Sequence, residues 1–432
     1  MNDPFFTIDE QLRRSADDAL SEVSPAFQRI AEITSYNQQK VLSAFIRHRV
    51  SEMHLGTSTG YGYDDPGRQT LEAVWADCMG AQDALIRHQF SSGTHTLAVA
   101  LFGVLRPKDT MLCLTGRPYD TLIDVLGIDQ PVSGSLADFG IEYDQVDLCS
   151  DGTPDLPAIR QKLQSHSYRM AYIQRSRGYS LRPSLTVEKI GELCRLVKEV
   201  SPDTVIMVDN CYGEFVQKQE PTQVGADLIA GSLIKNAGGG IAPTGGYIAG
   251  RKDLVEQCAY RMTAPGVGRE IGATLGHNRE LFMGVFSAPH VVGEALKTAV
   301  FASAFFQKLG YPVTPLPDEI RADIIQSVVL GDEKTLIAFC QGMQKGAPVD
   351  SFVIPEPWDM PGYNDQIIMA AGAFTGGASI ELSADAPLRS PYAAWMQGGL
   401  NFDSARIGVL LAAQSMLDCG ALTLQNQENA SC

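Results

Sequence analysis

The chain has 432 residues, of which 44% are hydrophobic and 19% are charged. These proportions are typical of a folded globular protein and exclude an intrinsically disordered chain. The 34 basic and 50 acidic side chains give a formal net charge of −16, which argues against nucleic acids and anionic membrane surfaces as partners. At this length we expect two domains, or one large domain with a cap.

Nine cysteines are spread along the chain, and no two of them form a Cys-x-x-Cys pair. This usage is typical of reduced thiols, so we expect a cytoplasmic protein. The first residues lack the basic-then-apolar pattern of a signal peptide. No apolar run reaches the ~18 residues that a membrane span needs. The seven histidines include no pair four residues apart, which excludes a His-Glu-x-x-His zinc helix, and we expect no metal.

The pattern of apolar residues predicts the elements of the first 290 residues. Residues 8–50 are expected to be helical, because apolar side chains recur there at steps of three and four. A glycine-rich loop follows at 56–68. Short apolar segments then alternate with helical ones, which indicates a mostly parallel sheet covered on both faces. The expected strands are 83–90, 110–116, 169–174, 203–210, 226–232 and 245–250, and the expected helices are 71–80, 94–105 and 187–200.

From about residue 290 the pattern changes. A helix at 290–310 is followed by a proline-rich region with few clean apolar strands and by a final helix near 404–419. We therefore expect an α/β protein in which the large sheet domain is followed by a smaller α+β domain. The predicted boundaries are an N-terminal helical segment at 1–50, a large domain at 51–290 and a small C-terminal domain at 291–432.

Four features of the large domain could contribute to one site. Asp209 ends an apolar strand, at the edge where α/β sheets bind ligands. Lys235 lies among small and apolar residues, and burial would lower its pKa and make it a usable nucleophile. Ser and Gly open the helix after residue 91, where free amides can bind an anion. Tyr119 could lie flat on a ring. Each feature alone has an ordinary explanation as a helix cap, a loop acid, a surface lysine or a core tyrosine.

Together, the order and spacing of these features favour pyridoxal phosphate as the cofactor. Lys235 would form the Schiff base, and Asp209, 235 − 209 = 26 residues earlier, would keep the pyridine nitrogen protonated so that the ring can accept electrons. A nicotinamide site is the weaker alternative. The glycines after Lys235 do not give the Gly-x-Gly-x-x-Gly spacing with an acidic residue about 20 residues further on.

The chain resembles the fold-type I pyridoxal-phosphate enzymes of cysteine and methionine metabolism. It is most similar to the bacterial group described as aluminium resistance protein or methionine γ-lyase family protein. The resemblance implies the transferase-like fold of that class and a homotetramer, a dimer of dimers with active sites shared between subunits. The similar segments are GTSTGYGYDDPGRQTLE, SSGTHTLAVALFGVLRP, PYDTLID, VDNCYGEF, GADLIAGSLIKNAGGGIAPTGGYIAG and GGASIELSADAPLRSPY.

By this resemblance, Lys235 corresponds to the Schiff-base lysine, Asp209 to the partner of the pyridine nitrogen, and Tyr119 to the tyrosine stacked on the cofactor ring.

The resemblance also assigns residues to the phosphate group. The assigned residues are Gly93 and Thr94 for backbone amides, Ser232 for a hydroxyl, and Tyr61 and Tyr63 on a loop lent to the neighbouring subunit. The better-known lyases have Tyr-x-Arg in that loop. This chain has Tyr-Gly-Tyr, so one positive partner of the phosphate is missing.

The substrate-binding residues depart further from the family pattern. The better-known lyases grip the substrate carboxylate with the arginine of an Arg-Leu-Ser segment, where this chain has Glu381-Leu382-Ser383. Arg389, Arg175 and Arg177 are the candidates for a bidentate contact with the carboxylate. The alternative for each is surface solvation or a structural ion pair, which we favour for Arg175 and Arg177.

The sequence therefore predicts a pyridoxal-phosphate-dependent carbon–sulfur lyase that acts on an amino acid by β- or γ-elimination. Lys235 would remove the α-proton of the substrate. Two alternatives stay open, because a fold does not fix a reaction. One is an aldolase or an aminotransferase on the same scaffold. The other is a non-catalytic cofactor binder, which the missing carboxylate arginine would explain.

Overall fold

The computed structural model divides into two compact units. The larger unit contains Ile33–His290 and Ile320–Asp323, and the smaller unit contains Met1–Glu32, Val291–Glu319 and Ile324–Cys432. The structure describes residues 5–130, 132–360 and 365–424. In these three ranges no helix combines the length and apolar character needed to cross a bilayer.

The N-terminal helical region consists of two helices instead of the single helix that we expected. Helix α1 spans Glu10–Glu22 and α2 spans Ser24–Arg47, with the break at Val23. Pro25 explains the break. A proline lacks the N–H that an interior helical residue donates, and its ring clashes with the carbonyl four residues earlier, so it is tolerated only in a first turn.

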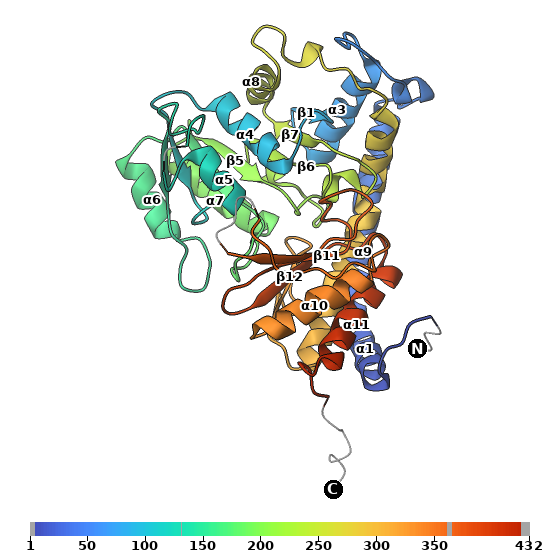
Figure 1. The fold of residues 1–432 in the computed structure, drawn as a ribbon. Helices are drawn as coiled ribbons and strands as arrows, with labels where there is room; N and C mark the ends of the chain where they lie inside the picture. The colour runs from blue at the N-terminus through green and yellow to red at the C-terminus, as the bar shows by residue number, and fades with distance from the viewer. Residues whose placement is uncertain (1–4, 131, 361–364, 425–432) are drawn as a thin grey trace. The chain divides into compact units, whose positions relative to one another are not determined.

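A seven-stranded sheet forms the centre of the larger unit (Figure 1), in the order β1-β7-β6-β5-β4-β2-β3. The five strands from β2 to β6 run parallel, and β7 is antiparallel to both β6 and β1. The prediction of a mostly parallel sheet is thereby confirmed. The strands are β1 (Asp83–Arg87), β2 (Thr110–Cys113), β3 (Glu142–Gln145), β4 (Met170–Gln174), β5 (Val205–Asp209), β6 (Leu228–Ser232) and β7 (Gly246–Gly250).

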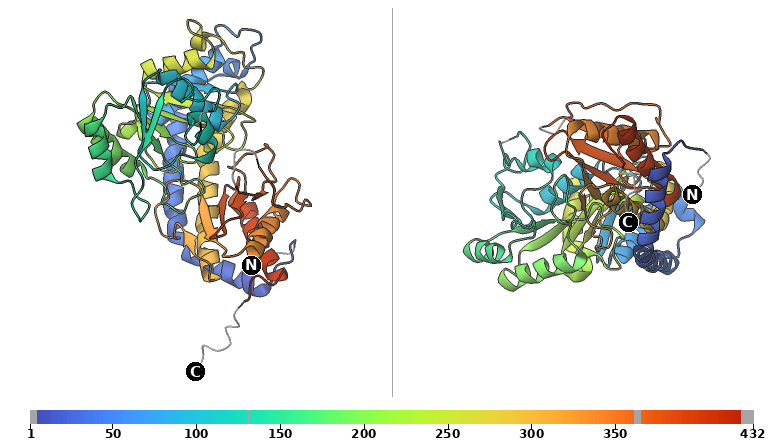
Figure 2. Two further views of the ribbon diagram at one scale, coloured as in Figure 1. Left: turned by 60° about the vertical axis from the view of Figure 1, so that its left-hand side comes forward. Right: turned by 90° about the horizontal axis from the view of Figure 1, so that it is seen from below.

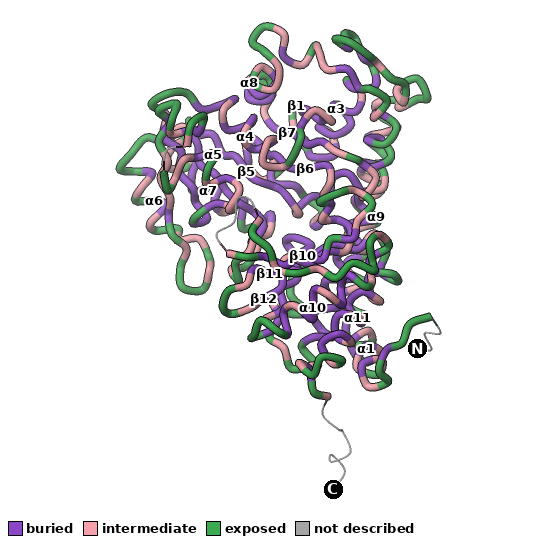
Figure 3. The backbone as a smooth tube through the Cα atoms, viewed as in Figure 1, coloured by how far each residue is buried: buried purple, intermediate pink, exposed green. Residues whose placement is uncertain are grey.

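Helices surround this sheet and bury it. Helices α4 and α8 pack against each other, as do α6 and α7. Apolar side chains of α4 and α8 form one core with β1, β5, β6 and β7. Strands β5, β6 and β7 are buried along their whole length (Figure 3), which is why they appear in the sequence as continuous apolar runs. The helices are α3 (Pro66–Met79), α4 (Gly93–Val104), α5 (Asp120–Leu126), α6 (Leu156–Ser165), α7 (Val187–Val200) and α8 (Lys252–Met262).

The second half of α2 runs alongside the first half of the long helix α9 (Asn278–Lys308), as Figure 2 shows. Phe45 of α2 packs edge-on against Phe282 and Phe286, with ring centres 5.8 and 5.6 Å apart. The Gln38 amide donates to the Phe286 carbonyl over 2.9 Å. These contacts pack the second half of α2 against the first half of α9 within the larger unit.

The smaller unit contains an antiparallel sheet of five strands in the order β10-β11-β12-β9-β8, so the predicted α+β architecture is confirmed. The final helix expected near 404–419 is α11 (Phe402–Asp418), which packs on α10 (Glu333–Lys345). The strands are β8 (Val313–Thr314), β9 (Gln326–Val329), β10 (Ile367–Ala370), β11 (Ser383–Pro387) and β12 (Ala393–Gln397).

Candidate active site

Three adjacent parallel strands of the large sheet end in buried polar residues. Gln174 ends β4, Asp209 ends β5 and Ser232 ends β6. Gln174 and Asp209 are register partners, and all three side chains are buried. The carboxyl ends of parallel strands are where α/β sheets bind ligands. The candidate site therefore lies at this edge of the larger unit.

Asp209 is a buried carboxyl held by two donors. One oxygen accepts from the backbone N–H of Cys211 over 3.1 Å, and the other accepts from the Tyr172 hydroxyl over 3.3 Å. Burial raises the pKa of Asp209 above its usual value, although the positive charge of Lys235 opposes this shift. A carboxylate in such a place is stabilised by a cationic partner.

Lys235 lies three residues after β6, at the start of the short turn Asn236–Gly238. Its amine nitrogen is 4.1 Å from the centre of the Tyr212 ring. The amide of Asn236 donates to the carbonyls of Tyr212 and Glu214 over 2.9 and 3.1 Å. These bonds tie the lysine turn to the loop after β5, so the two segments that flank the site are connected.

The charge environment corrects one expectation about Lys235. Burial by itself lowers the pKa of the ammonium, as the sequence suggested. The neighbouring Cys211, Tyr212, Asp209 and Glu214 outweigh burial, so the pKa of Lys235 is raised above its ordinary value. The prediction of a lowered pKa was wrong, because it considered desolvation without the acidic groups that the fold places around the amine.

The start of α4 and the end of β6 form a cradle for an anion. A methyl group on Gly93, the first residue of α4, would lie 3.4 Å from Cβ of Ser232 and 3.8 Å from Sγ of Cys211. The Ser232 hydroxyl is 1% exposed and has no hydrogen-bond partner among the described residues. An unpaired buried hydroxyl costs about 1–3 kcal/mol. Because the first amides of a helix are also free, this cradle suits a phosphate group.

Thr94, the second residue of α4, points its hydroxyl to that of Thr121 in α5, 2.8 Å away. The neighbouring N-cap is Ser92, whose side chain accepts from the His95 amide over 3.0 Å. Thr94 therefore lies beside Gly93 at the start of α4, next to the cradle.

Tyr119 is half-buried at the N-cap of α5. Its amide donates to the Gln174 side chain over 2.7 Å, and its ring meets Tyr179 edge-on with centres 5.7 Å apart. Gly178 has φ +57°, and a methyl group there would lie 3.1 Å from the Tyr119 ring. The loop after β4 thus determines where the Tyr119 ring lies.

The three candidate arginines have different surroundings. Arg175 is fully buried and donates to Asn210 and Gln217 over 2.8 and 3.3 Å, with Glu220 3.7 Å away. These contacts fit the structural ion pair that the sequence analysis favoured for Arg175.

Arg177 is also buried, and its Nε donates to Ser184 over 3.3 Å within the loop that contacts Tyr119. Arg389 belongs to the smaller unit, where it forms a half-exposed ion pair with Asp365 at 2.9 Å.

Tyr61 and Tyr63 lie on the loop 56–68 and are 71% and 60% exposed, with ring centres 5.6 Å apart. A buried arginine ties this loop to the segment 270–272. Arg68 donates to the carbonyls of Gly62, Gly272 and Glu270 over 2.6, 2.8 and 3.0 Å. The two phenols therefore face outward from a fixed turn.

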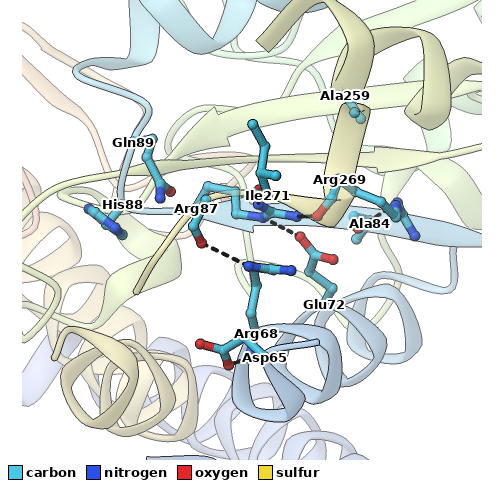
Figure 4. Close-up of polar contacts among 12 residues, drawn as sticks. Asp65, Arg68, Glu72, Ala84, Arg87, His88, Gln89, Ala259, Arg269 and Ile271 are labelled. Atoms are coloured by element: carbon cyan, nitrogen blue, oxygen red, sulfur yellow. Dashed lines mark hydrogen bonds and ion pairs between the residues drawn. The ribbon is translucent and has the colours of Figure 1, made fainter. Parts of the chain in front are cut away.

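A second buried arginine, Arg87, holds the neighbouring segment. It pairs with Glu72 at 2.5 Å and donates to the carbonyls of Arg269 and Ile271 (Figure 4). Buried donors that collect several carbonyls make a loop rigid, because each contact would have to be lost for it to move.

The sequence interpretation missed several members of the site, among them Gln174, Tyr172, Cys211, Tyr212 and Glu214. The segment VDNCYGEF contains three of them, so the strand-end acid was a usable signal for its neighbours. Tyr212 has φ +71°, which turns the loop back toward Lys235 and which sequence propensity does not indicate.

Comparison with known proteins identifies the family. The model of the methionine gamma-lyase family matches residues 12–417. The chain belongs to the methionine gamma-lyase family. It is 48% identical over 412 residues to the protein YnbB of Bacillus subtilis (strain 168), covering 95% of this chain and 98% of YnbB. The predicted resemblance is thereby confirmed.

Solved structures agree with this assignment. A carbon–sulfur lyase involved in aluminium resistance from Clostridium novyi NT is 50% identical with a TM-score of 0.92, covering 95% of this chain and 96% of that one. Cystathionine gamma-lyase from yeast is 15% identical with a TM-score of 0.58, covering 85% and 93% of the two chains. The yeast structure supports the fold alone, and that fold is the predicted fold-type I architecture.

Proposed function

We propose that the protein is a pyridoxal-phosphate-dependent carbon–sulfur lyase acting on an amino acid by β- or γ-elimination. The observation that supports it most strongly is the unpaired buried hydroxyl of Ser232. It lies against the start of α4 and three residues before Lys235. The similar Clostridium novyi protein, described as a carbon–sulfur lyase, supports the same reaction class.

The residues present suit pyridoxal phosphate. The cradle of Gly93, Thr94 and Ser232 would hold the phosphate, and the buried carboxyl of Asp209 would accept from the pyridine nitrogen. When bound, the cofactor would supply an electron sink for negative charge that develops beside the amino group of the substrate. Tyr119 would cover the ring, because Gly178 and Tyr179 fix its place at the N-cap of α5.

The chain's own groups would perform the proton transfer and the binding of substrate. Lys235 would remove the α-proton as a general base, on a turn that the Asn236 bonds keep in place. We infer that Arg177 would hold the carboxylate. Arg177 is buried in the loop after β4, the same loop whose Gly178 and Tyr179 contact the Tyr119 ring.

Product analysis tests the reaction. The protein would be incubated with single sulfur amino acids. A lyase releases ammonia, a 2-oxo acid and a thiol in equal amounts. Amino transfer to an added 2-oxo acid without thiol would indicate an aminotransferase, and retro-aldol products from β-hydroxy amino acids would indicate an aldolase. No product and no spectral change with any amino acid would favour a non-catalytic binder.

We also propose that the enzyme is a homotetramer whose active sites are shared between paired subunits. The phenols of Tyr61 and Tyr63 face outward from a clamped turn. Exposed apolar side chains of the larger unit lie on the neighbouring segments of α2, α9 and the loops between them. These are Leu42, Ile46, Met53, Leu275, Met283 and Phe286. Apolar surface of this kind is typical of a subunit interface.

Subunit mixing tests this arrangement. A phenol that donates to a charged phosphate contributes about 1.5–3 kcal/mol, so the Tyr61→Phe, Tyr63→Phe double variant should bind the cofactor weakly. Lys235→Ala should be inactive. In a mixed dimer with shared sites, one site has both defects and the other has neither. Mixing the two impaired proteins should then restore part of the wild-type activity.

The control for this experiment is to confirm that the subunits exchange. Native mass spectrometry, with one of the two variants isotope-labelled, measures this exchange. If exchange occurs and no activity returns, each loop acts within its own subunit, and the proposal of shared sites is wrong.

A further inference from the structure

Glu214 is a buried acid that the proposed reaction does not use. Its side chain is fully buried in the loop after β5. One carboxyl oxygen accepts from the Tyr247 hydroxyl over 2.7 Å, and the other has no partner among the described residues. A methyl group on Gly231 would come within 2.5 Å of the bonded oxygen. The carboxyl therefore lies against the backbone of β6, one residue before Ser232.

The backbone of Glu214 is joined directly to the lysine turn. Asn236, the residue after Lys235, donates to the carbonyls of both Glu214 and Tyr212. Tyr212 in turn lies under the lysine amine. Glu214 is also one of the groups whose charge raises the pKa of Lys235. The acid and the amine thus belong to one buried assembly and are coupled electrostatically.

The other charged and titratable groups around Glu214 come from three elements. Burial raises its pKa to about 8, and Glu220 contributes in the same direction, while the Tyr247 hydrogen bond and Arg175 oppose the shift. The charge of Glu214 also contributes to raising the pKa of Cys211, on the same loop. The carboxyl is therefore protonated at pH 7 and gains its charge in mildly alkaline solution.

We propose that Glu214 is a positioning residue that controls how tightly Lys235 holds its proton. While Glu214 is neutral, Lys235 can accept a proton from the substrate and release it again. When Glu214 ionises, its negative charge stabilises the ammonium, so Lys235 remains protonated and cannot act as a base. The inference rests on the proposed role of Lys235 as the reacting amine, and it adds a pH limit to that role.

The test measures Lys235 by itself and does not use turnover. Full-length wild-type protein and Glu214→Gln would be freed of cofactor and labelled with trace acetic anhydride between pH 6 and 10. Peptide mass spectrometry would compare Lys235 with the exposed Lys334 in the same chain. Glu256→Gln, the same change at an exposed position of α8, is the matched control.

We expect Lys235 to be labelled equally in wild type and Glu214→Gln at pH 6.5, where the side chain at position 214 is neutral in both proteins. Above pH 8, labelling in Glu214→Gln should become faster than in wild type, by about tenfold for each unit by which the pKa of Lys235 falls. Glu256→Gln should follow wild type at every pH. A ratio that stays constant with pH would overturn the proposal, because a packing role alone gives no midpoint near the pKa of Glu214.

A second variant guards against a local effect of the glutamine. Tyr247→Phe removes the hydrogen bond that favours the ionised carboxyl, so it should raise the pKa of Glu214. The pH at which Lys235 of this variant begins to be labelled more slowly than Lys235 of Glu214→Gln should therefore be higher than the same pH for wild type. An unchanged midpoint would contradict the proposal. These measurements report the reactivity of one amine and not turnover. A result that contradicts the role of Glu214 would therefore not contradict the lyase assignment. Likewise, the absence of lyase products would not alter the labelling result.

Stability against urea gives an independent check on Glu214. Its folded pKa of about 8 exceeds the ordinary value of 4.5, so its contribution to stability is complete below about pH 4.5 and is lost as the pH rises toward 8. The urea midpoint of wild type should therefore fall over this window relative to that of Glu214→Gln. Parallel midpoints across the window would show that Glu214 is already ionised in the folded protein, which would overturn the proposal.

Discussion

Asp209→Asn should keep the cofactor and lose turnover by orders of magnitude, on the scale of about 10²–10⁴-fold that a positioned electrostatic or acid–base group contributes. The carboxylate lies at the end of β5, with the amide of Cys211 and the hydroxyl of Tyr172 on its two oxygens. An amide of the same shape cannot stabilise a protonated pyridine nitrogen, so the electron sink weakens while the phosphate cradle is untouched. Steady-state kinetics and the visible spectrum measure the two effects separately.

Asp227→Asn is the matched control for this substitution. Asp227 lies just before β6 and pairs with Lys198 at 2.8 Å, and it accepts from the backbone amide of Ile206. Its loss should lower the free energy of unfolding and leave the turnover of the folded protein near that of wild type. If Asp209→Asn behaved in the same way, Asp209 would be a structural acid only.

Lys235→Ala should abolish turnover, with a loss of at least about 10⁴-fold, because one side chain would serve both as the attachment point and as the base. The substitution also removes the cationic partner of Asp209, so it should lower the free energy of unfolding, and turnover is compared on the folded protein. Lys252→Ala, at an exposed position of α8, is the control and should retain wild-type kinetics. Appreciable turnover by Lys235→Ala would show that another group is the base.

The sequence indicated the part of the fold that depends on apolar runs. Strands β5 and β6 are buried along their length, so their residues had to be continuously apolar, and both were located correctly. Strand β3 (Glu142–Gln145) was missed, because it is a polar strand at the edge of the sheet. The break between α1 and α2 was missed because the apolar period continues through Pro25.

The sequence likewise predicted some residues of the candidate site and not others. Asp209 and Lys235 could be identified because one ends an apolar strand and the other precedes a run of glycines. Their electrostatic environment could not, since it depends on side chains that the loop after β5 folds back toward the lysine. Tyr212 comes under the amine through a positive φ, and Glu214 reaches β6 and Tyr247. Such contacts arise from tertiary structure and have no period in the sequence.

The most direct test of the central claim is reduction with borohydride followed by peptide mapping. Borohydride converts an imine between a lysine and the cofactor into a stable amine, which fixes the label to the residue that formed it. The purified protein should be yellow, lose its colour on reduction, and have the pyridoxyl group on Lys235. A label on Lys218 or Lys252, both of which are exposed, or a protein that binds no pyridoxal phosphate, would contradict the assignment.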